Sequence, residues 1–226
     1  MDERFSRTSR LIGEDTLLEL KDKKVAVFGL GGVGSYVAEA LVRAGIGRLL
    51  LIDMDVVCAS NINRQLIALT STLGQPKVLV AKSRYLDINP DIQIETHELF
   101  YIEKSKDQID LSDCDYIVDA IDTITAKILL ITEAKSLNIP IISSLGTGNK
   151  IEGKYFKIDD IAKTSVCPLA RIMRKQLKRR GISDVKVLYS TEEPLIRERE
   201  PASISFVPSV AGLLIAGEVV RDMIAE

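Results

Sequence analysis

Runs of apolar residues separated by short polar segments divide the chain into alternating strands and helices. Residues 25–28 and 49–52 are apolar runs of strand length. Between them, apolar residues recur at helical spacing, at Val37, Ala38, Leu41 and Val42. A glycine-rich turn joins the first strand to this helix. The order strand, turn, helix, strand predicts the first βαβ unit of a parallel sheet.

The same alternation continues to about residue 150 and then stops. Further strands are predicted at 92–96, 115–122, 141–144, 185–189 and 203–206, and a hairpin-like pair around Ile151 and Tyr155-Phe156. Further helices are predicted near the N-terminus (an amphipathic helix with Leu11, Ile12, Leu17, Leu18 and Leu20), from 78 to 89, at 126–137, at 169–180 and from Pro208 onward; a polar loop covers 192–199. We expect an α/β fold with a Rossmann-like, doubly wound, mostly parallel sheet and an antiparallel C-terminal extension.

Length and composition favour one unit over residues 1–226. With 226 residues and 46% hydrophobic content, the chain can bury one substantial core. We expect a nucleotide-binding half at 1–150 and a second half at 151–226. The most apolar segment, 210–220, is short and interrupted by Glu218, which favours a packed helix over a membrane span. The charged N-terminus lacks the apolar region of a signal peptide, so we expect a cytoplasmic protein without a membrane partner.

Cysteine and histidine give no sign of a metal centre. Cys58, Cys114 and Cys167 are scattered and never spaced as CxxC, which argues against a disulfide framework and a four-cysteine zinc site. His97 is the only histidine and is interpreted as a surface residue. The net charge of −2 gives no overall attraction for nucleic acid, so any such contact requires a local basic patch.

The glycine-rich turn carries the first candidate chemistry. Without Cβ atoms, Gly29, Gly31, Gly32 and Gly34 allow a sharp bend and let a phosphate approach the main chain and the start of the following helix. Asp53, at the end of the second strand, suits a ribose hydroxyl. Together these residues predict a nucleotide site.

Polar residues after Asp53 favour a triphosphate over a dinucleotide. The segment from 54 to 65 contains Asp55, Asn61 and Arg64, and Lys77 follows Pro76 at the start of a helix. Cleavage between the α and β phosphates develops negative charge that requires cations. Arg64 and Lys77 supply them, although each alone fits an exposed arginine or an ordinary first-turn lysine.

Acidic residues end the strand at 115–122. In a parallel sheet, ligands collect beyond the carboxyl ends of the strands. Asp122 is expected beyond the strand and Asp119 within it, so Asp122 is the candidate for Mg²⁺. Asp122 also fits an N-cap for the next helix.

The predicted helix at 169–180 is strongly basic. Leu169, Ile172, Met173 and Leu177 share one face, and Arg171, Arg174, Lys175 and Lys178 lie largely on the other. Such a run is usually a solvated face. In a slightly acidic chain, however, six cations within ten residues also suit nucleic-acid phosphates.

Motifs along the first two-thirds of the chain resemble the ubiquitin-activating-enzyme-like adenylating family that includes the ThiF, MoeB and HesA proteins. These motifs are Arg4-Phe5-Ser6-Arg7, Gly29-Leu30-Gly31-Gly32-Val33-Gly34-Ser35, Asp53-Met54-Asp55, Ser60-Asn61-Ile62-Asn63-Arg64-Gln65, Gly74-Gln75-Pro76-Lys77 and Asp119-Ala120-Ile121-Asp122. The last third resembles the tRNA threonylcarbamoyladenosine dehydratase branch, through Thr164 to Arg171, Tyr189-Ser190 and Ser203 to Gly212.

The resemblance implies a homodimeric enzyme that depends on ATP and Mg²⁺. It implies that the glycine turn holds the adenine nucleotide, that Asp53 binds its ribose and that Asp55 is a further cofactor-binding residue. It also implies that Asn61, Arg64 and Lys77 bind the phosphates and that Asp122 holds the metal. Arg7 is expected to reach the ATP of the partner subunit. The implied reaction adenylates the threonylcarbamoyl carboxylate on a tRNA adenosine beside the anticodon. Ring closure then releases AMP, with net loss of water, and the second half of the chain serves tRNA and dimer contacts.

Cys167 departs from the aspartate that members of this branch often carry before Pro-Leu-Ala. Relatives that transfer a carrier protein to a cysteine use a thiol in about this place. Because the dehydratase reaction has no evident use for a thioester, we expect a structural or substrate-contacting role for Cys167. A sulfur-transfer protein remains a candidate partner.

Two other functions fit parts of the pattern. An adenylyltransferase for the C-terminal glycine of a ubiquitin-like sulfur carrier would share every nucleotide residue, but many such enzymes carry a pair of CxxC motifs that this chain lacks. A nicotinamide-dependent oxidoreductase would share the glycine turn, but it leaves Arg64, Lys77 and Asp122 without a role.

Overall fold

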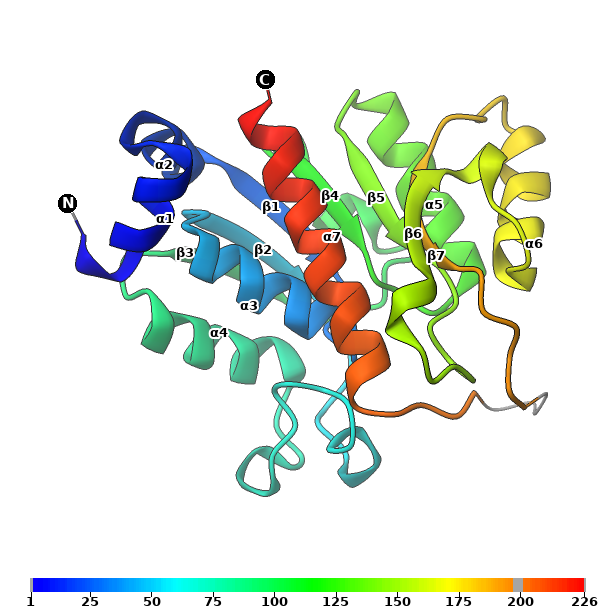
Figure 1. The fold of residues 1–226 in the computed structure, drawn as a ribbon, viewed down its shortest axis with the longest axis horizontal. Coiled ribbons are helices and arrows are strands. Elements are labelled where there is room, and N and C mark those ends of the chain that lie inside the picture. The colour runs from blue at the N-terminus through cyan, green and yellow to red at the C-terminus, as the bar shows by residue number, and fades with distance from the viewer. Residues whose placement is uncertain (1, 197–200, 226) are drawn as a thin grey trace.

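A seven-stranded sheet forms the centre of the computed structural model, which describes residues 2–196 and 201–225 (Figure 1). The strand order is β3-β2-β1-β4-β5-β7-β6. Neighbouring strands are parallel except for β6 and β7, which are antiparallel. The strands are β1 (Lys24–Phe28), β2 (Arg48–Ile52), β3 (Gln93–His97), β4 (Tyr116–Asp119), β5 (Ile141–Ser144), β6 (Phe156–Asp160) and β7 (Lys186–Ser190). The expected fold class and its antiparallel extension are confirmed.

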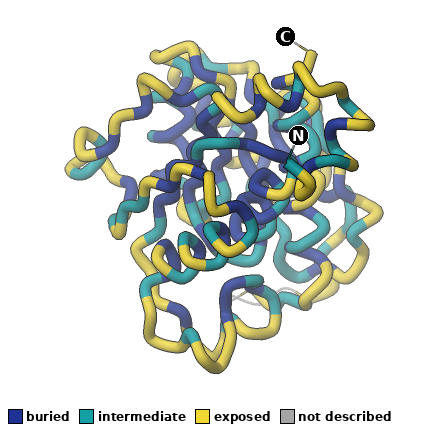
Figure 2. The backbone as a smooth tube through the Cα atoms, turned by 90° about the vertical axis from the view of Figure 1, so that its left-hand side faces the viewer, coloured by how far each residue is buried: buried dark blue, intermediate teal, exposed yellow. Residues whose placement is uncertain are grey.

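Helices cover both faces of the sheet, and this explains why its central strands are apolar without alternation. Every residue of β1, β4 and β5 is buried. One face packs against α3 (Gly34–Ala44), α4 (Lys77–Ile88) and α7 (Phe206–Ile224). The other packs against α5 (Ile124–Ser136), α6 (Pro168–Lys178) and the segment 101–114. Figure 2 shows the buried backbone in the interior and exposed positions mainly at the outer turns.

The remaining helices are short. Two α-helices, α1 (Ser6–Ile12) and α2 (Glu14–Asp22), precede β1. The 3₁₀ helices are η1 (Glu3–Phe5), η2 (Ala59–Asn61), η3 (Thr70–Thr72), η4 (Lys106–Gln108), η5 (Gly153–Tyr155) and η6 (Ile161–Lys163). The predicted single N-terminal helix is wrong because Gly13 separates α1 from α2 with φ of 96°. Leu11 is consequently 85% exposed instead of covering the core.

Two predicted strands are wrong. Residues 203–205 lie outside any strand, and Phe206 already belongs to α7. The backbone of this segment bonds to side chains instead, since Asn63 Nδ2 donates to the Ser203 carbonyl at 3.0 Å. Ile151 also lies outside any strand, and Phe156 begins a strand that pairs with β7, with Phe156 opposite Ser190. Residues 197–199 of the predicted polar loop lie outside the described residues.

Small residues let α7 pack closely against α3. A Cβ on Gly212 would lie 2.5 Å from the Val33 carbonyl oxygen and 2.8 Å from the Tyr36 Cβ. The close approach at Gly212 is therefore a contact within the chain. Within the described residues, no helix has the length and apolar character needed to cross a membrane.

Candidate active site

A cavity of about 800 Å³ opens beyond the carboxyl ends of β1, β2, β4 and β5. Four strand ends meet there because the strands are parallel, as in other doubly wound sheets. Its wall includes residues from the glycine turn, from the segments that follow β2, β3, β4 and β5, from the segment before α7, and from the first turns of α4, α5 and α7: Gly29, Gly31, Gly32, Asp53, Asp55, Asn61, Arg64, Gln65, Lys77, Phe100, Asp122, Lys127, Gly146, Pro201, Ser203 and Pro208.

The glycine turn is shaped by close backbone contacts. Gly29 has φ of 87°, and a Cβ on it would lie 2.7 Å from the Ala120 carbonyl oxygen. A Cβ on Gly34 would lie 1.8 Å from the Gly29 carbonyl oxygen. Gly34 therefore brings α3 against the turn, while Gly31 and Gly32 border the cavity. No described side chain caps the start of α3. Ser35 N and Tyr36 N already donate to the Gly31 and Val33 carbonyls, at 3.2 and 3.1 Å, so the donors left for an anion are the N–H groups of the turn itself, at Gly32, Val33 and Gly34.

Asp53 is held in place by two backbone N–H groups. Leu30 N donates to Oδ2 at 2.6 Å, and Asp55 N donates to Oδ1 at 2.8 Å. Burial raises the pKa of Asp53 above its ordinary value, although the nearby Lys77 charge opposes this. Each carboxylate oxygen retains a further acceptor site. Asp53 can therefore accept hydroxyl donors from a ribose, as the sequence predicts.

Lys77 brings a buried positive charge to the cavity. Lys77 is 4% exposed, and its Nζ lies 2.7 Å from Asp55 Oδ2 and 4.0 Å from Asp53 Oδ2. The predicted nucleotide residues Asp53, Asp55 and Lys77 are thus brought together. Because Asp55 already binds Lys77, its position indicates a role in orienting the ammonium group.

Asn61 is the last residue of η2, and Arg64 lies on the segment that follows it. Arg64 Nη1 donates to the Ser60 carbonyl and to Asn63 Oδ1, both at 2.9 Å. Among the described residues, no carboxylate lies within ion-pair distance of Arg64, so its charge is available to an anion. Asn61 Oδ1 accepts from Cys58 N at 3.0 Å, which leaves the Asn61 amide N–H groups for a ligand.

Asp122 borders the cavity beyond β4, and Asp119 is the last residue of the strand, as predicted. Thr123, not Asp122, is the N-cap residue of α5, and Asp122 Oδ1 accepts from Thr123 Oγ1 at 3.1 Å. The described residues contain no cluster of three metal-ligating side chains. A single exposed carboxylate still fits Mg²⁺, which is commonly held by one or two carboxylates together with substrate phosphates.

Sequence reasoning missed a buried ion pair in the cavity wall. Lys127, 1% exposed, donates to both oxygens of Asp119, at 3.1 and 3.0 Å, and to the Ser144 carbonyl at 2.8 Å. Asp119 also accepts from Ser143 Oγ at 2.5 Å and from Ile121 N at 3.1 Å. These contacts tie β4, β5 and α5 together and fix the loop that carries Asp122. The signal in the sequence was a lysine directly before the apolar run 128–131, five residues after Asp122.

The segment before α7 was also missed as part of the site, because it was predicted to be a strand. Ala202 N donates to Asn149 Oδ1 at 2.7 Å, and Asn149 N donates to the Ala202 carbonyl at 2.8 Å. A Cβ on Gly148 would lie 2.7 Å from the Pro201 Cβ. Residues 201–203 are therefore fixed against the loop after β5, where they border the cavity.

Arg7 is not brought to the cavity of its own chain. It is exposed on α1, which is followed by α2 and the amino end of β1 (Figure 1). The cavity lies at the opposite, carboxyl end of that strand.

The prediction for the basic helix α6 needs two corrections. Arg171, Lys175 and Lys178 are exposed as predicted. Arg174 is only partly exposed, since its Nη1 donates to the Thr164 carbonyl at 2.9 Å and also bonds Thr164 Oγ1. Arg174 therefore holds the segment before α6. Ile172, predicted on the apolar face, is 43% exposed.

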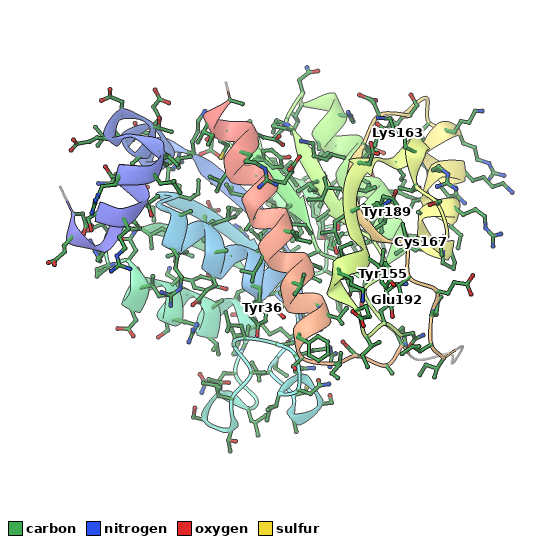
Figure 3. All side chains as sticks on the ribbon, viewed as in Figure 1. Tyr36, Tyr155, Lys163, Cys167, Tyr189 and Glu192 are labelled. Carbon is green, nitrogen blue, oxygen red and sulfur yellow. The ribbon has the colours of Figure 1, made fainter. Side chains whose placement is uncertain are left out.

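Cys167 is buried at the start of α6, behind the cavity wall. It is 5% exposed, and a Cβ on Gly146, which borders the cavity, would lie 3.2 Å from its Sγ. Figure 3 shows Cys167 and Glu192 on the same side of the molecule. Glu192 contacts Lys150, whose pKa is lowered by burial and whose ammonium group donates to the Glu192 carbonyl.

Comparison with known proteins connects this geometry with adenylating enzymes. The ThiF family model matches residues 5–225. The tRNA threonylcarbamoyladenosine dehydratase of Bacillus subtilis is 43% identical over 98% of this chain and 95% of its own length. The Escherichia coli enzyme of the same name is 37% identical over 84% of this chain and 74% of its own length.

Solved structures agree with the sequence comparison. The E. coli dehydratase in complex with AMP has a TM-score of 0.93 and 34% identity, covering 99% of this chain and 94% of that chain. Its complex with ATP has a TM-score of 0.92, with the same identity and coverage. A family match over nearly the whole sequence, close relatives of similar length and a shared fold lead to one conclusion: this chain belongs to the ThiF family.

Proposed function

We propose that this protein is an ATP-dependent tRNA threonylcarbamoyladenosine dehydratase. Its relatives of that name match nearly the full chain, and one of them was solved with ATP and with AMP. The single structural observation that carries the proposal is the convergence of Asp53, Lys77 and Arg64 on one cavity beside a glycine turn. That set combines a ribose acceptor with cations for phosphates.

The reaction follows from the chemistry of a carboxylate. An oxygen of the threonylcarbamoyl carboxylate attacks the α-phosphorus of ATP, the bond to the β-phosphate breaks, and pyrophosphate leaves. An atom of the same side chain then attacks the activated acyl carbon and loses its proton. AMP departs with the former carboxylate oxygen, so the net change is loss of water.

We assign parts in this reaction to the candidate residues of the cavity. Asp53 orients the ribose, and the glycine turn accepts the phosphates against the start of α3. Lys77 and Arg64 stabilise the negative charge that develops on the phosphates, and Asn61 donates to them. Asp122 would hold Mg²⁺, which when bound would neutralise phosphate charge. The cavity positions both reactants for in-line attack.

The test is mass analysis of nucleosides from bulk tRNA after incubation with the enzyme and ATP. We expect one modified adenosine to lose the mass of one water only when ATP is present. ATP–pyrophosphate exchange is measured in parallel with modified tRNA and with ubiquitin-like sulfur carriers. Exchange driven by a carrier alone would replace this proposal with the adenylyltransferase function.

We further propose that the enzyme works in the cytoplasm as a homodimer, and that Arg7 reaches the ATP of the partner subunit. Large apolar side chains of α7 are exposed, with Phe206 46%, Leu213 52% and Leu214 38% exposed. A second subunit against α7 would cover them. The half of the chain at 151–226 would then supply dimer and tRNA contacts.

Sulfur-transfer proteins are candidate additional partners. Pull-down with purified proteins tests this, and a sulfur-transfer protein that is not retained would be excluded as a partner.

We propose a structural role for Cys167, because its thiol is buried against the loop after β5. Exchange of Cys167 for serine is expected to leave the dehydration reaction largely intact. Abolished turnover in a folded Cys167→Ser variant would instead support covalent catalysis.

A further inference from the structure

Gln65 has a buried side chain with an unsatisfied acceptor. The residue is 7% exposed and borders the cavity. Within residues 2–196 and 201–225, its Oε1 is the only buried side-chain nitrogen or oxygen without a hydrogen-bond partner. Leaving such a group unpaired costs stability, so it calls for a physical explanation.

The missing partner does not result from a loosely held segment. Gln65 N donates to the Asn61 carbonyl at 2.9 Å, and its own carbonyl accepts from Ala68 N at 3.1 Å. The neighbouring hydroxyl of Ser35 is already engaged, since it donates to the Gly31 carbonyl at 2.6 Å and accepts from Leu66 N at 3.3 Å. The backbone therefore fixes the amide beside the cavity while nearby donors are directed elsewhere.

The amide lies at the glycine turn. Gln65 Nε2 is 3.8 Å from the position that a Cβ on Gly31 would take. Arg64, the preceding residue, has its Cγ 3.3 Å from the corresponding position on Gly32. The Gln65 amide therefore lies at the part of the cavity where main-chain N–H groups and the start of α3 favour an anion.

Phosphate oxygens at neutral pH accept hydrogen bonds, and a glutamine amide offers two N–H donors as well as its acceptor oxygen. A hydrated phosphate chain can also bring an ordered water that donates to a buried carbonyl oxygen. One amide in this place can thus use both of its ends when a triphosphate is bound.

We propose that Gln65 is a phosphate-binding residue whose NH₂ group donates to ATP, and whose Oε1 receives its missing donor from water held by the phosphates. This inference rests on the proposed ATP-dependent function and adds an uncharged donor to the cations Arg64 and Lys77. The nucleotide-free protein is then less stable because Oε1 lacks a donor, and ATP binding supplies that donor.

The experiment compares Gln65→Met, which keeps length but removes hydrogen bonding, with Gln65→Glu, which keeps shape but adds negative charge. Thermal unfolding without nucleotide and calorimetric binding of ATP and of adenosine are measured for each variant. For Gln65→Met we expect unchanged or higher thermal stability and an ATP Kd about 10- to 100-fold weaker, the effect of removing a hydrogen bond to a charged group. Gln65→Glu should weaken ATP binding further, because the carboxylate of the variant would face the negatively charged phosphates. Adenosine, which has no phosphate, should bind all variants alike.

The matched control is Gln108→Met, at an exposed glutamine of η4, which should change neither property. Lower stability with unchanged ATP affinity in Gln65→Met would identify a merely structural amide and overturn the inference. If the variant bound ATP and adenosine with equally weakened affinity, the inference would also be overturned, because the contact would then lie away from the phosphates. Failure of the unmodified enzyme to bind ATP would instead reject the proposed function itself.

Discussion

At the scale of single residues, two cations of different accessibility serve the same cavity. Lys77 is buried and held by Asp55, whereas Arg64 is held only by neutral oxygens. An oriented, buried charge stabilises a developing negative charge more strongly than one in water. We therefore expect both cations to act mainly on the chemical step.

Replacing either cation should strongly reduce adenylation. Lys77→Ala and Arg64→Ala are each expected to lower ATP–pyrophosphate exchange by at least ~100-fold, the typical cost of removing a preorganised donor to a transition state. Lys82→Ala is the matched control, because Lys82 lies on the same helix but outside the cavity wall. Near-normal exchange in both active-site variants would show that neither cation contacts the reacting phosphates.

The raised pKa of Asp53 predicts an unusual dependence of stability on pH. The folded protein holds the Asp53 proton more tightly than the unfolded chain, whose ordinary value is 3.8. The contribution of Asp53 to the free energy of unfolding should therefore increase as the pH falls through the raised pKa toward 3.8. It is least favourable above the raised pKa. Urea unfolding of wild type and Asp53→Asn across this pH range tests this direction. If the free energy of unfolding of wild type fell relative to that of Asp53→Asn on acidification, the prediction would be contradicted.

ATP affinity should change in the opposite direction. An ionised carboxylate is the stronger acceptor for ribose hydroxyls, so protonation of Asp53 weakens the nucleotide contact. We expect calorimetric ATP binding to weaken on acidification at a higher pH than for an ordinary aspartate. Affinity that stays constant until the pH reaches the ordinary aspartate range would rule out this contact.

The buried pair of Lys127 and Asp119 predicts a large stability effect. Lys127→Met leaves a buried carboxylate without its counter-charge and should cost about 3–5 kcal/mol in the free energy of unfolding. Adding Asp119→Leu should recover much of that loss, since neither charge then remains. Urea unfolding measures both. A double variant no more stable than Lys127→Met would show that the charges are not the reason for the loss.

At the scale of elements, hydrophobic patterning predicted most of the sheet and its helices, because β1, β2 and β4 are buried and mostly apolar. The glycine turn, Asp53 and Asp122 also followed from their places at strand ends. The cavity wall formed by residues 201–203 did not, because side-chain amides of Asn63 and Asn149 hold that segment in a non-strand conformation. Local sequence contains no signal for such long-range contacts.

Helix α6 gives a prediction at the same scale. Arg171, Lys175 and Lys178 are exposed, while Arg174 is bound to Thr164. Neutralising the three exposed cations to glutamine should weaken tRNA binding. It should also reduce the slope of log Kd against log salt, by up to about 0.7–0.9 for each tRNA phosphate that is no longer neutralised.

Arg174→Gln provides the contrast for α6. It should mainly lower thermal stability, because it releases the Thr164 segment, and leave the salt slope nearly unchanged. If the slope of log Kd against log salt were unchanged in the triple variant, α6 would be a solvated surface without a role in tRNA binding.

At the scale of the whole molecule, the distance of Arg7 from its own cavity makes a second subunit part of the proposed mechanism. Arg7→Ala and Arg64→Ala homodimers should both be nearly inactive. Mixing and reassembling them should restore activity, because one site of each mixed dimer then has Arg64 in its own chain and Arg7 from its partner. Size measurement by light scattering checks assembly. No recovery in confirmed mixed dimers would exclude action of Arg7 across the interface.

The wall formed by residues 201–203 and Pro208 also has a consequence for biosynthesis. All seven strands leave the ribosome before these residues do, so a growing chain can complete its sheet while the pocket still lacks one side. The cavity would therefore gain its last side only after α7 has emerged and docked on α3, so this part of the wall is the last to form during synthesis.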